Sequence, residues 1–181
     1  MEVFFDCERC KGGYKVIFVT VGTHEQPFNR LIEYIDDLKG KKIIQEDVVI
    51  QSGFSTYKPK HCKWSKLFAY QEMRKIVDDA RIIITHGGPS SFIMPLQIGK
   101  IPIVVPRQKR FNEHINDHQV TFTKAAAEKM GTIIVVINVE HLGNVVSNYD
   151  KIIAQMPSKL NSNNARFCER FEQVVYGLMR G

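Results

Sequence analysis

The sequence predicts an α/β fold, in the form of one Rossmann-like domain with a mostly parallel sheet flanked by helices. Short, continuously apolar and β-branched runs are typical of strands that are covered on both faces. These runs alternate along the chain with segments whose apolar residues recur at helical spacing. Glycine-containing turns separate several runs from the segments that follow, and strands that alternate with helices build right-handed βαβ units around a parallel sheet.

Composition places the chain among globular proteins. Its 181 residues suit one domain, and hydrophobic and charged residues make up 44% and 24% of it. The net charge of +6 favours solubility, an anionic ligand or an anionic membrane surface, whereas the scattered basic residues argue against nucleic acid as a partner. No apolar run approaches the roughly 20 residues of a membrane span. Residues 1–7 do not resemble a signal peptide, so we expect a cytoplasmic protein.

The first half of the chain is expected to form one side of the sheet. Residues 1–14 fit no periodic pattern and are expected to be an extension outside the core. Apolar residues then recur at helical spacing from Phe28 to Ile35, and Gly40 ends that helix. The expected elements are a strand at 16–21, a helix over 28–40, strands at 48–51 and 66–69, and a helix over 71–80.

The second half continues the alternation. The helix that ends at Gly99 is expected to turn Phe92, Ile93, Leu96 and Ile98 towards the core. We expect the domain to comprise residues 15–156, with a linker and a C-terminal amphipathic helix over 157–181. The expected elements are a strand at 82–84, the helix that ends at Gly99, a strand at 101–106, a helix over 117–130, a strand at 133–136 and two closing helical stretches.

The segment Thr85-His86-Gly87-Gly88-Pro89-Ser90-Ser91 is expected to join a buried strand to a helix. Such a junction points backbone N–H groups and the positive end of a helix dipole at one spot, which suits a phosphate. Gly87 and Gly88 let the backbone come close to the phosphate, and Ser90 and Ser91 offer hydroxyl and N–H donors. The alternative is an ordinary helix start with Ser90 as the N-cap. The Gly-x-Gly-x-x-Gly and Gly-Lys-Ser/Thr fingerprints are both absent.

Ligands of parallel sheets bind at the carboxyl ends of the strands. That rule gathers Gly22-Thr23-His24, Gln51-Ser52-Gly53, His86–Ser91 and the loop after Pro106 at one edge. The loop from Arg107 to Gln119 is dense in hydrogen-bonding side chains, which suits a polyhydroxylated ligand; the alternative is a solvated loop with Asp117 as a helix cap. Glu113 is the candidate for ribose hydroxyls. The other candidates for ribose or sugar binding are Gln108, Asn116, His118 and Gln119.

As a set, four motifs resemble the C-terminal, donor-binding half of GT-B glycosyltransferases. They are Val19-Thr20-Val21-Gly22-Thr23, His86–Ser91, Gly99–Pro106 and Asn116-Asp117-His118-Gln119. The sequence is similar to the stand-alone halves, which include the small catalytic subunit of the two-part dolichol-diphosphate N-acetylglucosamine transferase and its bacterial counterparts in capsule and exopolysaccharide synthesis. The resemblance covers about Lys15 to Met156 and implies a fold equivalent to one half of a GT-B enzyme.

The resemblance implies a hexosyltransferase that inverts the anomeric centre, takes a UDP-sugar as donor and needs no metal or other cofactor. The donor diphosphate would lie on His86–Ser91 with Gly22 and Thr23 facing it, where the helix dipole and backbone donors offset the charge of the leaving group. The acceptor would be a saccharide on a polyprenyl diphosphate. A separate, membrane-anchored subunit would bind that acceptor and recruit this chain to the cytoplasmic face of the membrane as a heterodimer.

The catalytic residues follow less directly from the resemblance. Many GT-B donor domains hold the ribose with an acidic residue three or four positions after the serine, where this chain has Met94 and Pro95, so Glu113 is the candidate here. His24 and His114 are candidate general bases, although His24 could simply line the phosphate cleft. The alternatives are a non-catalytic nucleotide-sugar-binding or scaffold subunit, and a sugar-nucleotide epimerase, for which two nucleotide-binding domains are expected.

Two further patterns concern the ends of the chain. Cys7 and Cys10 form a lone Cys-x-x-Cys pair, and free thiols are the preferred interpretation over zinc or redox chemistry. The C-terminal helix is expected to dock on the core of its own domain, to grip the partner subunit or to contact a membrane. Its apolar stripe is formed by Phe167, Phe171, Val174, Val175 and Leu178.

Overall fold

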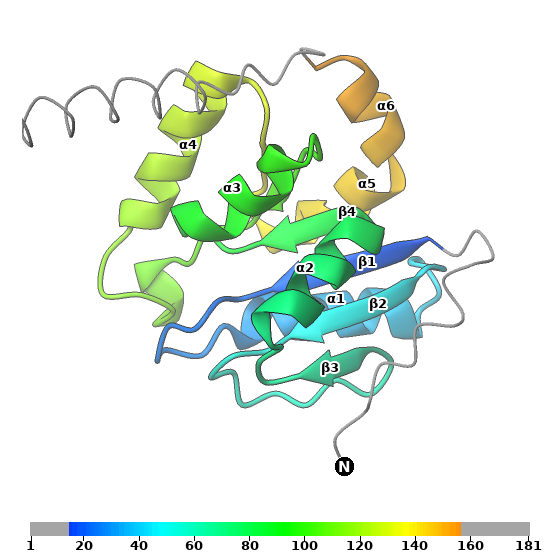
Figure 1. The fold of residues 1–181 in the computed structure, drawn as a ribbon. Helices are drawn as coiled ribbons and strands as arrows, with labels where there is room; N and C mark the ends of the chain where they lie inside the picture. The colour runs from blue at the N-terminus through cyan, green and yellow to red at the C-terminus, as the bar shows by residue number, and fades with distance from the viewer. Residues whose placement is uncertain (1–14, 157–181) are drawn as a thin grey trace, which may run out of the picture.

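A computed structural model describes residues 15–156, and its strands form one parallel sheet in the order β3-β2-β1-β4-β5-β6 (Figure 1). The strands are β1 (Val16–Thr20), β2 (Asp47–Gln51), β3 (Lys63–Ser65), β4 (Ala80–Thr85), β5 (Ile103–Val104) and β6 (Ile134–Val135). The helices are α1 (Asn29–Gly40), α2 (Tyr70–Asp79), α3 (Pro89–Gln97), α4 (His118–Met130), α5 (Leu142–Ser147) and α6 (Tyr149–Ala154). Short 3-10 turns lie at η2 (Lys109–Phe111) and η3 (Val139–His141). The predicted Rossmann-like class is confirmed.

Several predictions fall on residues outside the described range. They concern the extension over 1–14, the Cys7–Cys10 pair and the linker and amphipathic helix over 157–181. The proposed domain boundaries therefore stay predictions. Of the cysteines, Cys62 is described; it is a half-buried free thiol, and burial raises its pKa to about 12.

The sheet is covered on both faces because its strands are apolar on both faces. Ile17 and Val19 of β1 belong to the core that packs against α1, which lies behind the sheet in Figure 1. Phe18 points the opposite way and packs in a second cluster with Ile76 and Val77 of α2, in front of the sheet. This alternation follows from the two-residue period of a strand. It explains why β1 is apolar at every position from Val16 to Val19.

The strand order creates a switch point between β1 and β4. The chain builds outwards from β1 through β2 to β3, then returns to the other side of β1 to form β4. Thr20, the last residue of β1, pairs with Gln51 of β2 and with Thr85 of β4. The loops after β1 and β4 therefore start side by side, and such a crevice is where open α/β sheets bind ligands.

The prediction of a strand at 66–69 is wrong, because the strand in this region is β3. Trp64 of β3 pairs with Ile50 of β2 and is half-buried. Beyond Ser65 the strand pairing with β2 ends. The carbonyl of Lys66 instead accepts a hydrogen bond from the backbone N–H of Gly53 (2.9 Å).

The predicted inward face of α3 is also partly wrong. Phe92 is buried, but Ile93 and Ile98 are 42% and 39% exposed.

The strands β5 and β6 are two residues long, and Pro102 and Pro106, which lack an N–H donor, lie just outside β5.

Asp36 of α1 fastens the loop between β2 and β3 to the domain. Its carboxylate is 1% exposed and accepts hydrogen bonds from the backbone N–H groups of Lys60 (2.9 Å) and His61 (2.7 Å) and from the Tyr57 hydroxyl (2.9 Å). Burial alone would raise the pKa of Asp36, but these bonds lower it overall. One ionised side chain thus orders the loop, together with Tyr57 and Cys62, which pack against the core.

Lys100 bonds the carbonyl groups at the carboxyl end of α2. Its ammonium group donates to the carbonyl oxygens of Val77 (2.8 Å), Asp78 (2.5 Å) and Ala80 (2.6 Å) at the end of α2. The last carbonyl groups of a helix have no partner within the helix. Lys100 supplies a hydrogen-bond partner for them. The Gly99-Lys100 pair in the motif Gly99–Pro106 therefore has a structural role.

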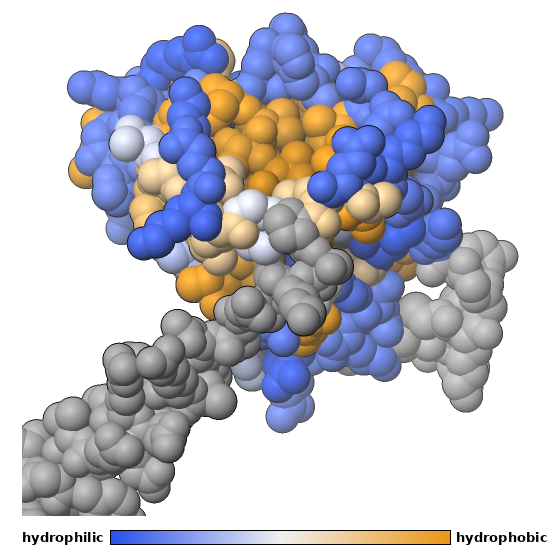
Figure 2. Space-filling view, turned by 90° about the horizontal axis from the view of Figure 1, so that it is seen from above, coloured by the Kyte–Doolittle hydropathy of each residue, from blue (hydrophilic) through white to orange (hydrophobic). Residues whose placement is uncertain are grey.

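The surface carries an apolar area on the side where α4 and α6 lie. Figure 2 looks down on this side and shows hydrophobic residues in the middle, bordered by hydrophilic ridges. Exposed apolar areas of this kind are contact surfaces for other segments or chains.

Between residues 15 and 156, no helix has both the length and the apolar character to cross a membrane.

Candidate functional site

At the carboxyl edge of the sheet, the backbone at Gly22 and at Gly88 lies close to the His86 ring. We call this arrangement the cradle. Gly22 has a φ of +73°, and a Cβ atom there would collide with the His86 ring. Gly88 approaches the same ring from the other side, where a Cβ would lie 2.5 Å from Nε2. Gly53 has a φ of +53° and would strike the carbonyl oxygen of Gly22. At Gly22 and Gly88 a side chain is therefore excluded because its Cβ would collide with the His86 ring, and at Gly22 the positive φ favours glycine as well.

His86 is a neutral side chain at the centre of this cradle. Its backbone N–H donates to the carbonyl of Thr20 (3.1 Å), which fixes β4 against β1 at the edge. Burial, and then the positive charge of Arg107, lower the pKa of His86 to about 4. Its Nδ1 is buried, with no hydrogen-bond partner in the described part of the chain. The ring thus fills space between two glycines without adding charge.

Helix α3 begins directly beside this ring. Its N-cap is Gly88 and Pro89 is its first residue, so the alternative in which Ser90 caps the helix is wrong. The Ser91 hydroxyl lies 2.6 Å from the carbonyl of Gly88 and 3.1 Å from that of His86, so it holds the turn closed. Ser90 is exposed. Pro89 has no N–H and the N–H of Ser91 bonds to the carbonyl of Gly88 (3.1 Å), so the N–H of Ser90 is the donor that this first turn can offer to an anion.

The loop after β5 packs against the same glycine turn. The Gln119 side chain accepts a hydrogen bond from the backbone N–H of Arg107 (3.1 Å), and its Cβ would lie 2.9 Å from a Cβ placed on Gly87. Asn116 and His118 are exposed at the start of α4, where Asn116 Oδ1 accepts the His118 backbone N–H (3.1 Å). The polar loop and the glycine turn are thus parts of one edge. Thr23, on the loop after β1, is exposed.

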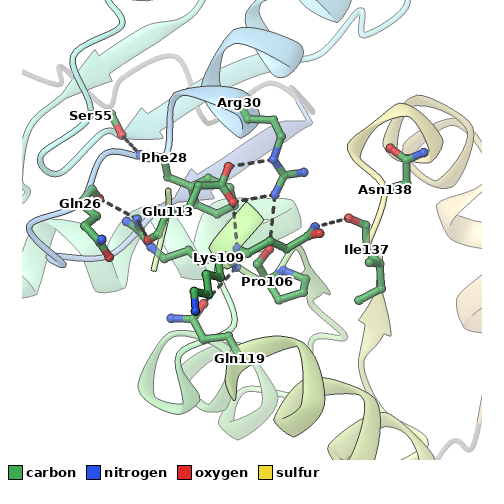
Figure 3. Close-up of polar contacts among 12 residues, drawn as sticks. Gln26, Phe28, Arg30, Ser55, Pro106, Lys109, Glu113, Gln119, Ile137 and Asn138 are labelled. Atoms are coloured by element: carbon green, nitrogen blue, oxygen red, sulfur yellow. Dashed lines mark hydrogen bonds and ion pairs between the residues drawn. The ribbon is translucent and has the colours of Figure 1, made fainter. Parts of the chain in front are cut away.

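Glu113 is bonded inside the protein rather than facing solvent (Figure 3). Its carboxylate is 2% exposed and receives two hydrogen bonds from Arg30 of α1, at 2.8 and 2.9 Å, and one from the backbone N–H of Gln108, at 3.0 Å. Gln108 is also buried and donates through Nε2 to the carbonyl of Ile137 (2.7 Å). A carboxylate offers about four acceptor sites, so three are occupied. The ribose role of Glu113 stays a prediction, and this geometry favours support of the loop.

Arg107 is a site residue that the sequence prediction missed. It is 0% exposed and donates to the carbonyl oxygens of Val21 (2.8 Å), Gln26 (2.6 Å) and Glu113 (3.1 Å). Its guanidinium lies over the ring of Phe28, 4.9 Å from the centroid. Burial lowers the pKa of Arg107 to about 10, which leaves the side chain protonated at neutral pH. It joins the loops after β1 and β5.

The two candidate bases come together at the mouth of the cradle. The ring centroids of His24 and His114 are 4.9 Å apart. Partial burial, the charge of Arg107 and His114 itself lower the pKa of His24, against the opposite effect of Glu25. His24 Nδ1 accepts the backbone N–H of Gln26 (3.2 Å), so the neutral ring carries its proton on Nε2. To act as a base, His24 must accept the proton on Nδ1 and give up this bond.

A second hollow lies away from the cradle, along α1. Its volume is about 700 Å³, and it is lined by α1, the end of the loop after β5 and η3. Tyr34 crosses it to donate to the carbonyl of Glu140 (2.9 Å). The carboxylates of Glu33, Asp37 and Glu140 make this hollow unsuited to a diphosphate, whereas the atoms nearest to Gly22 and Gly88 belong to the neutral His86 ring.

The geometry of the cradle agrees with a comparison of the sequence with family models. A model described as the glycosyltransferase family 28 C-terminal domain matches residues 16–174. The chain belongs to this family. A comparison with curated proteins finds no match. The resemblance to GT-B donor-binding domains is thereby confirmed at the level of the family.

Solved structures of glycosyltransferases share the fold of this family 28 domain. One is the glycotransferase of kitacinnamycin, with a TM-score of 0.50 and 18% identity over 76% of this chain. Another is CalG4, the calicheamicin glycosyltransferase, with a TM-score of 0.51 and 14% identity over 92% of this chain. This chain spans 35% and 44% of the length of those two proteins. At these identities the likeness establishes the GT-B-type fold.

Proposed function

We propose that this family 28 domain is the donor-binding catalytic subunit of a two-component, inverting glycosyltransferase. It takes a UDP-sugar and transfers the sugar to a polyprenyl-diphosphate-linked saccharide in exopolysaccharide or capsule biosynthesis. The observation that carries the proposal is the cradle at the β1–β4 switch point, where Gly22, Gly88 and the first turn of α3 surround a neutral His86. The membrane-anchored acceptor subunit is proposed from the likeness of the motifs to stand-alone donor-binding halves.

The cradle suits a diphosphate leaving group for electrostatic reasons. When the acceptor oxygen attacks the anomeric carbon, the bond to the diphosphate breaks and UDP leaves with additional negative charge. The backbone N–H of Ser90 in the first turn of α3 and the positive end of the helix dipole would stabilise that charge, whereas the N–H of Gly22 would first have to release the Thr20 hydroxyl (3.3 Å). The proposed reaction needs no metal because these donors take the place of a cation.

The proton of the acceptor hydroxyl requires a base, and His24 and His114 are the proposed candidates. Both rings lie at the mouth of the cradle, and the lowered pKa keeps His24 neutral at pH 7. A base in this position would give a rate that falls as the pH drops through its pKa. The His24→Gln and His114→Gln variants test this role, because loss of transfer with UDP binding retained assigns the base.

One assay separates catalysis from mere binding. The chain would be combined with membranes that contain or lack its proposed partner, and transfer of radiolabelled sugar from UDP-galactose, UDP-glucose and UDP-N-acetylglucosamine to the lipid fraction would be measured. We expect transfer from one of them with the partner present. UDP binding without transfer under any condition would instead support a scaffold subunit.

The ribose assignment has its own test. Glu113→Ala would be titrated with UDP and with pyrophosphate, which lacks a ribose. A larger loss of affinity for UDP supports the ribose role, whereas equal losses show that Glu113 acts through the loop it holds to Arg30.

A further inference from the structure

Arg107 combines deep burial with the absence of a direct ion pair, although the Glu113 carboxylate partly offsets the effect of burial on its pKa. Its three hydrogen bonds all go to backbone carbonyl oxygens, those of Val21, Gln26 and Glu113. Over residues 15–156, no carboxylate lies close enough to form an ion pair with it. The nearby Glu113 carboxylate is bonded to Arg30 instead (Figure 3). A buried charge without a charged partner is costly to the folded state, so its presence calls for a reason.

The position of Arg107 supplies that reason. Val21, which accepts one of its bonds, directly precedes Gly22 of the cradle, and Gln26 ends the short loop that carries His24. Its third acceptor, Glu113, directly precedes His114. One guanidinium therefore holds both histidine-bearing loops at the edge where the diphosphate is proposed to bind. Because Arg107 is enclosed by protein, solvent screens its charge less than it would at the surface.

We propose that Arg107 is a positioning residue of the donor cleft: it fixes the His24 and His114 loops against each other, and its charge, which no ion pair neutralises, attracts the donor diphosphate. The inference deepens the proposed function and rests on it. The bound diphosphate supplies a counter-charge in addition to the Glu113 carboxylate, which is already paired with Arg30. Arg107 does not touch the reacting atoms.

Two further observations are consistent with this role. The charge of Arg107 lowers the pKa of both His86 and His24, so its field reaches the centre and the mouth of the cradle. Its Nε is also buried without a hydrogen-bond partner in the described range, so even the guanidinium's hydrogen bonding is incomplete. A purely structural arginine would be expected to satisfy all of its donors.

The test compares Arg107→Met, Arg107→Lys and a control, Arg81→Met. Arg81 is bonded to Glu46 and Asp150 at the amino end of β4, so its loss removes the same charge from the opposite edge of the sheet. Calorimetry would measure the binding of UDP, pyrophosphate and uridine by the full chain, and NMR would follow the titration of the His24 ring. His114 and Glu25, which also act on His24, stay in place in every variant.

Arg107→Met should weaken UDP and pyrophosphate by about tenfold or more, the usual scale for a charge-assisted contact, and leave uridine unchanged. It should also raise the pKa of His24 and flatten the salt dependence of UDP binding. Arg107→Lys should keep the pKa of His24 low but weaken UDP, because the single ammonium nitrogen cannot reach all three carbonyl oxygens that the two Nη atoms of the guanidinium bond. The control should leave UDP binding unchanged.

Two results would overturn the inference. One is a folded Arg107→Met variant with unchanged pyrophosphate affinity and unchanged titration of His24. The other, decisive if Arg107→Met does not fold, is an Arg107→Lys variant that binds UDP as the wild type does. Failure of the proposed function is distinguishable, because a wild-type chain that binds pyrophosphate but not UDP would contradict UDP-sugar specificity and leave the role of Arg107 intact.

Discussion

The close approach of Gly22 to His86 yields a prediction with a matched control in the same chain. Gly22 and Gly99 have nearly the same φ, +73° and +76°, both in the left-handed region. A Cβ on Gly22 would collide with the His86 ring, whereas a Cβ on Gly99 would meet nothing within 4 Å. The two Gly→Ala variants therefore share the cost of a left-handed alanine, about 1–2 kcal/mol, and differ only in the contact at the cradle.

The contact adds a cost of its own at Gly22. Displacing a packed ring costs about 1–3 kcal/mol, so Gly22→Ala should lose roughly 2–5 kcal/mol of unfolding free energy against about 1–2 for Gly99→Ala. The displaced ring would also enter the space proposed for the diphosphate. Gly22→Ala should therefore weaken UDP binding by about tenfold or more, whereas Gly99→Ala should leave it unchanged.

Gly88→Ala separates the two effects further. Gly88 has a φ of −76° and a ψ of 130°, which any residue adopts, yet its Cβ would lie 2.5 Å from His86 Nε2. This variant should weaken UDP binding without the conformational cost. Urea unfolding and calorimetric titration with UDP measure the two quantities. Equal behaviour of the Gly22 and Gly99 variants in both assays would refute the reasoning.

Three other side chains give predictions that urea unfolding can check. Lys100→Met removes three bonds to the end of α2 and should lower the unfolding free energy by about 1.5–3 kcal/mol, with UDP binding unchanged. Asp36→Asn should lower the unfolding free energy by about 1–3 kcal/mol. Because the folded-state pKa of Asp36 is lowered, the wild type should lose this stability as the pH falls below about 4. If the unfolding free energy of the variant falls with pH in the same way as that of the wild type, the assignment is contradicted. Glu113→Gln leaves Arg30 without its carboxylate and should cost about 3 kcal/mol; a loss under 1 kcal/mol would show that the pair is dispensable.

The fold was predictable because its signals are local. Continuous β-branched runs such as Ile82–Ile84 mark strands buried on both faces, and the parallel arrangement then follows from the alternation with helices. The shared edge of the Gly22, Gly53 and His86 turns follows from that topology alone. Where the signal was weak, prediction failed: β3 has three residues, and Trp64 lies in a polar segment with several separate lysines.

The site was predictable as a location but not as a set of contacts. Nothing in the sequence links Arg30 to Glu113, which is 83 positions away, so the carboxylate could not be recognised as already paired. Burial of Arg107 depends on the carbonyl groups of Val21 and Gln26 in a distant loop and on that of Glu113 in its own loop. The available signal was its place immediately after Pro106, at the carboxyl end of a buried strand, where a charged residue is either exposed or part of a site.

The most direct measurement of the central claim is an NMR titration of the isotope-labelled chain with UDP. If the cradle holds the donor diphosphate, the backbone amides of Gly22, Gly87, Gly88 and Ser90 should shift, and Gly88→Val should abolish those shifts without unfolding the chain. Shifts confined to Arg30, Tyr34 and Glu140 would instead place the nucleotide in the hollow along α1 and contradict the account.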